Sequence, residues 1–499
     1  MQPAAQPAAA TRPQPLERSL RARGRRPPRP LTALAVATVL LGFAWALFMP
    51  GGQSPDEPSH IAYAQVLAER FDVPQPDEVS GRERGYSREQ RLARDRSHQQ
   101  WQYAEPAVKS EWDPAVERRW RSESARLGAG DRSDGGGPNS AAGNPPLYYA
   151  YEALPYYAAY AGDFFDRLYA MRMWSALLLA AAVVATWLLV GELTGGDRLA
   201  QLIASGVVGL QPMASFISAS INPDAGLIPL WALTFWLGVR LLRRRAGLLG
   251  AAALVAAAVA ALLVKASSVA LIPAVAFALL VAARRALRGR QVGSGRIAVL
   301  ITGGALALAA AVVATSGRIG TVLTFRPKDV LRFVDYLWQA YLPNLPFQEP
   351  IPHLAAFEGY DIWIRTGWAA FGWLEIQFPA PVYVLLAVTS VAIVVAGGVA
   401  IARRRFPLDT LVLAFLALAA VTLVAVLHWA EFRQFADQRQ SFIQGRYLLP
   451  LLPLGGILTA AAVASLRVRW RGLAAGAVLG GLFALQLFSL GLVAVRFYV

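Results

Sequence analysis

Residues 31–60 read LTALAVATVLLGFAWALFMPGGQSPDEPSH, and this stretch contains both features on which the fold prediction depends. Its first part, 31–49, carries no charge and is as long as the roughly 20 residues with which a helix crosses a bilayer. The acidic motif Pro-Asp-Glu-Pro follows at 55–58. The stretch therefore predicts a membrane span that leads into a polar segment at the membrane surface.

Ten further apolar runs follow along the 499 residues, of which 56% are hydrophobic and 16% charged. So little charge cannot cover the surface of a soluble enzyme, and the absence of cysteine excludes disulfides, thiolate catalysis and thiolate-bound metal. We predict an all-α polytopic membrane protein with about 11 transmembrane helices. The further runs are 171–193, 199–220, 224–242, 247–264, 267–283, 297–315, 380–402, 408–428, 447–466 and 473–495.

The net charge of +16 is concentrated between the apolar runs, which indicates membrane topology and not nucleic-acid binding. If every basic cluster is cytoplasmic, the N-terminus lies inside, the C-terminus lies outside, and 247–283 holds two short helices hinged near Lys265. Span 31–49 also resembles a signal peptide, but no small-residue cleavage motif follows it. The clusters are Arg18–Arg29, Arg243–Arg245, Arg284–Arg296, Arg403–Arg405 and Arg467–Arg471.

These spans divide the chain into a disordered basic cytoplasmic tail, 1–30, and a transmembrane domain, 31–499. Two long external loops are predicted inside this domain, at 50–170 and 316–379. The first contains short amphipathic helices, because a polar part without a spanning run occupies most of it. Loops of this length usually have a function or remain disordered.

The first candidate site is the carboxylate pair Asp56 and Glu57 after the first span. Adjacent carboxylates repel each other, so one can serve as a general base, or the pair can hold a divalent cation. His60 can add a ligand or an acid–base group. The structural alternative is a helix N-cap formed by Asp56 or Ser59.

Two further polar positions lie at the same predicted membrane face. Asn222-Pro223-Asp224 separates two spans, although this tripeptide also suits a turn with an N-cap. Lys265 is a lone charge in a long apolar stretch, which points either to a function such as phosphate binding or to a side chain that snorkels to the interface.

Gln444-Gly445-Arg446-Tyr447 begins the run at 447–466 from the external side. An external arginine beside a glycine is suited to binding phosphate, while an interfacial anchor is the alternative. An aromatic cluster, Trp363 to Trp373 with Glu375, can stack on sugars or isoprenoids, or simply line the interface. His353, Asp361 and Arg365 lie in the same loop.

Together these motifs resemble the DUF2142 family of bacterial membrane proteins over about residues 31–490. The resemblance rests on PDEP, NPPLYY at 144–149, NPD at 222–224, the lysine near the fifth span, FGWLE at 371–375 and QGRYLLPLLP at 444–453, in this order. The family is similar to the GT-C superfamily of integral-membrane glycosyltransferases, so a GT-C-like fold is expected.

The resemblance implies hexosyl or pentosyl transfer from a polyprenyl-phosphate sugar, with inversion, to an envelope glycan, lipid or protein. It assigns the base to Asp56, with Glu57 as partner or alternative, and the donor phosphate to Arg446 and Lys265. Asn144 stands where related motifs carry Lys or His. No metal ligand set is assigned. From the residues and the resemblance taken together, the predicted substrate-binding residues are His60, Asn144, Tyr148, Asn222, Asp224, Lys265, Trp373, Glu375, Gln444, Arg446 and Tyr447.

The predicted location is the bacterial plasma membrane, where membrane lipids are further partners. The competing function is a transporter or flippase of lipid-linked glycans, which needs the phosphate contacts but no base. A non-catalytic scaffold of an envelope complex would need neither.

Overall fold

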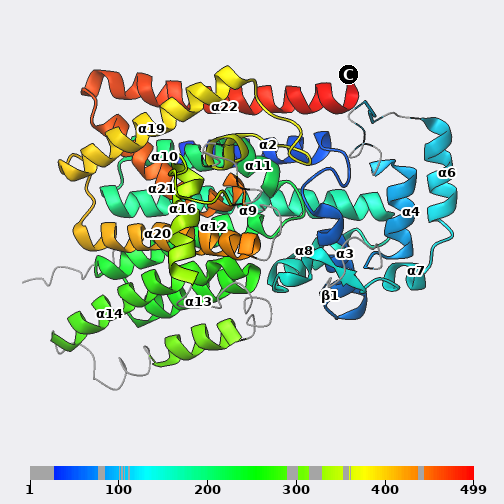
Figure 1. Ribbon diagram of the computed structural model, residues 1–499, viewed down its shortest axis with the longest axis horizontal. Helices are drawn as coiled ribbons and strands as arrows, with labels where there is room; N and C mark the ends of the chain where they lie inside the picture. Colours follow the sequence, from blue (N-terminus) through cyan, green and yellow to red (C-terminus); the bar gives the residue numbers. More distant parts are fainter. Residues whose placement is uncertain are drawn as a thin grey trace, which may run out of the picture.

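The protein is described by a computed structural model (Figure 1). The structure describes residues 27–76, 85–99, 113–288, 302–313, 329–351, 361–436 and 443–499, together with residues 102, 105, 107–110, 354 and 359. Most of the cytoplasmic tail predicted at 1–30 lies outside these ranges.

Helices dominate the described part of the chain, as the apolar runs predict. Within the described ranges, eight helical segments are long and apolar enough to cross a membrane, and a bent pair makes a ninth. They are α2 (Arg29–Phe48), α9 (Phe164–Thr194), α12 (Asp224–Leu242), η2 with α14 (Ala266–Leu271 and Ile272–Arg288), α19 (Ala380–Ala402), α20 (Thr410–Ala436), η4 with α21 (Gly445–Leu451 and Leu452–Ala464) and α22 (Val468–Tyr498), with α10 (Arg198–Leu210) and α11 (Pro212–Ser218) as the bent pair.

Two shorter apolar helices, α13 (Leu248–Val264) and Thr302–Val313, occupy the remaining predicted runs. The all-α polytopic class is therefore confirmed, and each of the eleven runs contains a helix. Eleven membrane crossings stay a prediction, because fewer than eleven of the described helices are both long and apolar enough to cross a membrane.

The run predicted at 199–220 is interrupted, and the hinge predicted between 247–264 and 267–283 is present. α10 and α11 meet at an angle of 58°, because Pro212 has no N–H to continue the helix and the Gln211 side chain caps the new one at Ala214 N. Lys265 is extended between α13 and η2, which is the break that the flanking arginines predict.

The centre of the bundle is α9, which packs against α2, α10 and α12. Small residues allow the close approaches: a Cβ on Gly42 of α2 would lie 2.8 Å from the Ala176 Cβ of α9. A buried polar chain also links helices, since Trp45 Nε1 donates to Gln486 (2.7 Å) and the Gln486 amide donates to Ser215 Oγ (2.6 Å).

The described part of the loop predicted at 50–170 forms a cap of short helices at one end of the bundle, on the right in Figure 1. Two strands of two residues each, β1 (Gln75–Pro76) and β2 (Pro138–Asn139), pair in parallel within it. Its helices are α3 (Glu57–Arg70), α4 (Arg88–Arg96), α6 (Pro114–Ser124), α7 (Ala129–Ser133), η1 (Ser140–Gly143) and α8 (Leu147–Ala158).

The described part of the second loop contains α16 (Asp329–Tyr341), the π-helical turn η3 (Asp361–Arg365) and α18 (Thr366–Trp368). η3 and α18 lie against η4, so this loop reaches the segment that contains Arg446. A tight turn follows, with Phe371 and Ile376 exchanging backbone hydrogen bonds at 2.9 and 3.2 Å.

We predict that Gly397→Ala in α19 destabilises the protein, whereas Gly398→Ala does not. A Cβ on Gly397 would lie 2.4 Å from the backbone oxygen of Leu458 in α21, but nothing lies within 4 Å of one on Gly398. Both substitutions gain about 1 kcal/mol of helix propensity, so a difference in stability between the two variants must come from packing. Thermal unfolding in detergent measures the difference, and equal melting temperatures would contradict the packing described here.

Candidate functional site

The site begins at the sharp corner between α2 and α3. Asp56 occupies the N-cap position of α3 with left-handed backbone angles (φ 59°), yet its side chain makes no capping hydrogen bond. The side chain is 52% exposed. Ser59 does not cap the helix with its side chain either, since its hydroxyl bonds Tyr86 and Ser140. The carboxylate of Asp56 therefore remains available at the surface of the site.

Glu57 is fully buried and holds this corner in place. Its carboxylate receives Arg172 Nε at 2.8 Å and Nη2 at 2.5 Å, together with the backbone N–H groups of Gly52 (3.1 Å) and Ile221 (3.3 Å). The other guanidinium hydrogens of Arg172 go to the carbonyls of Ala46, Met49 and Pro50. The catalytic role predicted for Glu57 stays untested, but this geometry is that of a positioning residue.

Arg446 lies opposite Asp56 at the start of η4. Its Nη2 is 3.4 Å from Asp56 Oδ2, while its Nε and Nη1 are buried and have no hydrogen-bond partner among the described residues. The side chain is only 4% exposed. Buried guanidinium donors without an acceptor are costly, and an oxyanion would satisfy them. Gly445 allows the close packing behind Arg446, because a Cβ there would lie 2.5 Å from Gly367 N.

The turn at 222–224 and Lys265 complete the polar floor. Asn222 Oδ1 accepts the N–H of Asp224 (2.9 Å), and its amide nitrogen lies 3.5 Å from the carbonyl of Pro55. Lys265 Nζ donates to Asp224 Oδ1 at 2.5 Å and lies 4.6 Å from the centre of the Tyr447 ring. The turn predicted at 222–224 is therefore present, while the N-cap position of α12 is Pro223, which makes no side-chain capping bond. Lys265 forms an ion pair with Asp224.

A group of aromatic side chains forms the wall below Asp56. His60 Nδ1 lies 2.8 Å from Tyr149 OH, and the Tyr149 ring stacks on Tyr63 at 3.7 Å. Tyr63 OH donates to the carbonyl of Asn144 (3.2 Å). Burial lowers the pKa of His60 to about 4, against the opposing charge of Asp56, so this histidine is neutral at pH 7. Next to it, Tyr148 OH accepts the N–H of Asn222 at 2.9 Å.

Glu152 and Arg172 are site-supporting residues that the sequence reasoning missed. Glu152 is fully buried beside Tyr148, and neither carboxylate oxygen has a hydrogen-bond partner of good geometry among the described residues. Burial raises its pKa to about 8, an effect that the hydroxyls of Tyr148 and Ser175 reduce. A signal for Arg172 was present, since it is a lone charge at the external end of an apolar run.

The structure brings most predicted residues together but places two of them to the side. Trp373 Nε1 donates to the carbonyl of Gly52 (3.2 Å), so it supports the loop before Asp56. Glu375 forms an ion pair with Arg496 of α22 at 3.2 Å. Gln444 accepts the N–H of Tyr447 with its carbonyl (3.0 Å). His353 lies outside the described residues.

A divalent cation near Asp56 and Glu57 stays an untested prediction. Both oxygens of Glu57 are committed to Arg172 and backbone N–H groups, and Asp56 faces Arg446. Within the described ranges, no group of three or more His, Cys, Asp or Glu side chains could hold a metal ion. Of the two carboxylates, only Asp56 could therefore offer an oxygen to a cation without breaking the contacts of Glu57.

An apolar groove of about 780 Å³ begins beside the polar site. Gly445 and Leu448 of η4 line it next to Arg446, and Trp363 and Trp368 come from the second loop. From there it runs along α19, α21 and α22. The apolar groove therefore shares helix η4 with the polar site, although Arg446 itself is not among the residues that line the groove.

Fold and site together define a polytopic membrane protein with a charged site at one end of its helical bundle and an apolar groove that shares helix η4 with this site. The chain belongs to the family described as "Predicted membrane protein (DUF2142)", whose model matches residues 39–455. This confirms the family that the motifs predict.

Two solved structures are similar in fold. The apo oligosaccharyltransferase of Archaeoglobus fulgidus is 11% identical, with 92% of this chain and 56% of that chain covered and a TM-score of 0.49. Apo ArnT of Cupriavidus metallidurans is 15% identical, with 89% and 61% covered and a TM-score of 0.45. The chain thus spans less than two thirds of the length of either. No curated protein matches it.

We predict that Glu152→Gln stabilises the protein increasingly as the pH rises from 5 to 8. The native pKa near 8 exceeds the ordinary value of 4.5, so ionisation of the unfolded chain lowers the free energy of unfolding by about 1.4 kcal/mol per pH unit in this window. Glutamine cannot ionise and removes this dependence.

Melting temperatures of both proteins across this pH range measure the effect, with the partly exposed Glu117→Gln as the control. A constant difference between Glu152→Gln and the wild type would show that the wild-type carboxylate ionises in the folded protein.

Proposed function

We propose that this protein is an integral-membrane glycosyltransferase that moves a sugar from a polyprenyl-phosphate donor to an acceptor hydroxyl on the extracytoplasmic side. One observation carries the proposal. Arg446 has two buried donors without an acceptor and lies 3.4 Å from the available carboxylate of Asp56. A cation for a leaving phosphate and a base for an incoming hydroxyl are therefore adjacent.

The phosphate of the donor binds between Arg446 and Lys265. Both cations lie over the Tyr447 ring, Arg446 Cζ at 5.2 Å and Lys265 Nζ at 4.6 Å from its centre. Arginine is suited to bidentate contact with phosphate, and lysine adds a point charge. The two groups together offset the charge that develops on the phosphate as the sugar leaves.

The isoprenoid chain of the donor occupies the apolar groove. Gly445, the residue before Arg446, lines this groove, which supports a ligand whose phosphate lies on Arg446 and whose hydrocarbon chain lies between α19, α21 and α22. A soluble sugar phosphate or nucleotide sugar would have no use for such a groove.

Transfer needs one proton movement and one displacement. Asp56 takes the proton of the acceptor hydroxyl. At the same time, the oxygen of that hydroxyl forms a bond to the anomeric carbon of the sugar. The bond from that carbon to the phosphate oxygen breaks, and the phosphate keeps the electron pair. Direct displacement inverts the anomeric configuration. Glu57 and Arg172 take no proton and hold the corner on which Asp56 stands.

A transporter or flippase for lipid-linked glycans would use the same groove and the same cations. The half-exposed carboxylate of Asp56 favours the enzyme, because sugar transfer requires a base and transport requires none. The transfer assay described next tests the reaction together with the identity of the donor and the acceptor.

We predict that Asp56→Asn abolishes sugar transfer, with a loss of at least about 100-fold from removal of the general base. The purified protein is given radiolabelled polyprenyl-phosphate sugars with an envelope fraction as acceptor. Undecaprenyl- and dolichol-linked donors are tested first, because the solved structures of ArnT and of the archaeal enzyme AglB contain undecaprenyl phosphate and dolichol-phosphate.

The control is Asp72→Asn, which removes an exposed carboxylate just beyond the end of α3. It should transfer sugar like the wild type. Transfer that survives Asp56→Asn would reject the base assignment, and donor binding without transfer in the wild type would favour the transporter.

A further inference from the structure

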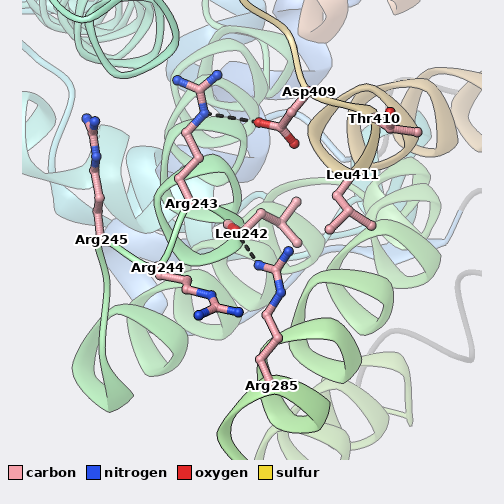
Figure 2. Close-up of a pocket in the computed structure, with 8 residues that line it drawn as sticks. All are labelled: Leu242, Arg243, Arg244, Arg245, Arg285, Asp409, Thr410 and Leu411. Atoms are coloured by element: carbon pink, nitrogen blue, oxygen red, sulfur yellow. Dashed lines mark hydrogen bonds and ion pairs between the residues drawn. The ribbon is translucent and has the colours of Figure 1, made fainter. Parts of the chain in front are cut away.

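A second basic pocket lies at the opposite end of the bundle, between α12, α14 and α20 (Figure 2). Its volume is about 560 Å³. The polar side chains that line it are Arg243, Arg244, Arg245, Arg285, Asp409 and Thr410. Arg243 pairs with Asp409 and Arg245 with Glu192 (2.9 Å), so Arg244 and Arg285 are the two arginines of the pocket with no carboxylate partner among the described residues.

The direction of α12 places this pocket at the other membrane face. The helix begins at Asp224 in the candidate site and ends at Leu242 beside the pocket. Its 19 residues rise by about 27 Å, which is close to the thickness of the hydrocarbon core. Nothing bound here can take part in the chemistry at Asp56.

Arg243 and Arg245 are used inside the protein, and Arg245 donates to Glu192 Oε1 at 2.9 Å. Arg243 pairs with Asp409 (3.2 Å) and donates to the carbonyls of Glu192 (2.6 Å), Leu193 (2.8 Å) and Pro407 (2.8 Å). The lone carboxylate of the pocket is therefore already paired.

Arg244 and Arg285 keep donors for a ligand. Arg285 uses Nη1 on the carbonyl of Leu242 (2.5 Å), and the Arg244 side chain forms no hydrogen bond or ion pair with any described residue. Arg244 also has left-handed backbone angles (φ 58°). Figure 2 shows both side chains at the pocket, with Leu242 and Leu411 beside them.

Such a pocket suits one chemical class, a phosphate group carried by an apolar molecule. Two guanidinium groups provide forked donors for phosphate oxygens, and the leucines provide a surface for hydrocarbon. Basic pockets between transmembrane helices bind anionic lipid head groups in this way. We propose that the pocket formed by Arg244 and Arg285 binds the head group of an anionic phospholipid in the leaflet opposite the Arg446 site.

A matched control exists in the same chain. Arg403–Arg405 also ends a span with three arginines, its middle residue has φ 55°, and Arg405 N bonds Ala400 O as Arg245 N bonds Arg240 O. This triplet does not line the pocket. If arginines attract anionic lipid only by their charge, the two triplets contribute equally to lipid binding. If the pocket is a specific site, only the triplet at 243–245 contributes.

The test measures binding of a fluorescent phosphatidylglycerol to the full chain in detergent micelles. A double variant of the pocket, Arg244→Ala with Arg285→Ala, is compared with a control double variant, Arg404→Ala with Arg284→Ala. Both double variants remove two positive charges. We expect binding of the probe to be about tenfold weaker in the pocket variant and unchanged in the control variant. Arg244→Gln alone also weakens binding, and because this side chain is exposed and unpaired, the variant keeps the wild-type melting temperature.

Equal loss in both double variants, or no loss in either, would overturn the proposal. Phosphatidylcholine should not compete with the probe. Millimolar inorganic phosphate should not displace it either, and full displacement would identify a soluble phosphate as the ligand and reject the lipid. The result is independent of sugar transfer at Asp56.

Discussion

The buried ion pair between Glu57 and Arg172 is the contact on which the candidate site depends. It joins α3 to α9 and reaches the end of α2 through three backbone carbonyls. Taking two charges out of water is costly, and loss of one partner typically costs about 3–5 kcal/mol because the other stays buried. The pair therefore fixes the geometry of the corner, and Asp56 is held in its left-handed conformation with its carboxylate directed at Arg446.

The two ends of the bundle use arginine differently. Arg446 is buried, is paired at one nitrogen only, and lies 5.2 Å from the centre of the Tyr447 ring. Arg243 at the other end has every nitrogen bonded within the protein. An arginine whose N–H groups are all hydrogen-bonded within the protein stabilises the fold. A buried arginine with unpaired N–H groups is instead suited to binding an anion. Counting charges along the sequence cannot separate these two cases.

The spans and the main site residues could be predicted from the sequence for simple reasons. Long apolar runs mark helices, and polar residues at their ends, such as Asp56, Asp224 and Arg446, fall at one membrane face once the topology is set. The roles of Glu57 and Glu152 could not be predicted, because they depend on contacts between distant segments. Arg172, for example, is 115 residues from Glu57. The break after α10 was also missed, since Pro212 lies within an apolar run.

The most direct measurement is the affinity of the purified protein for undecaprenyl phosphate, compared between the wild type, Arg446→Gln and Asp56→Asn. If the buried guanidinium is the phosphate site, Arg446→Gln weakens binding at least about tenfold. Asp56→Asn then binds as tightly as the wild type or more tightly, because a competing carboxylate is gone. Wild-type affinity in Arg446→Gln would contradict the account, since the phosphate would then be held elsewhere.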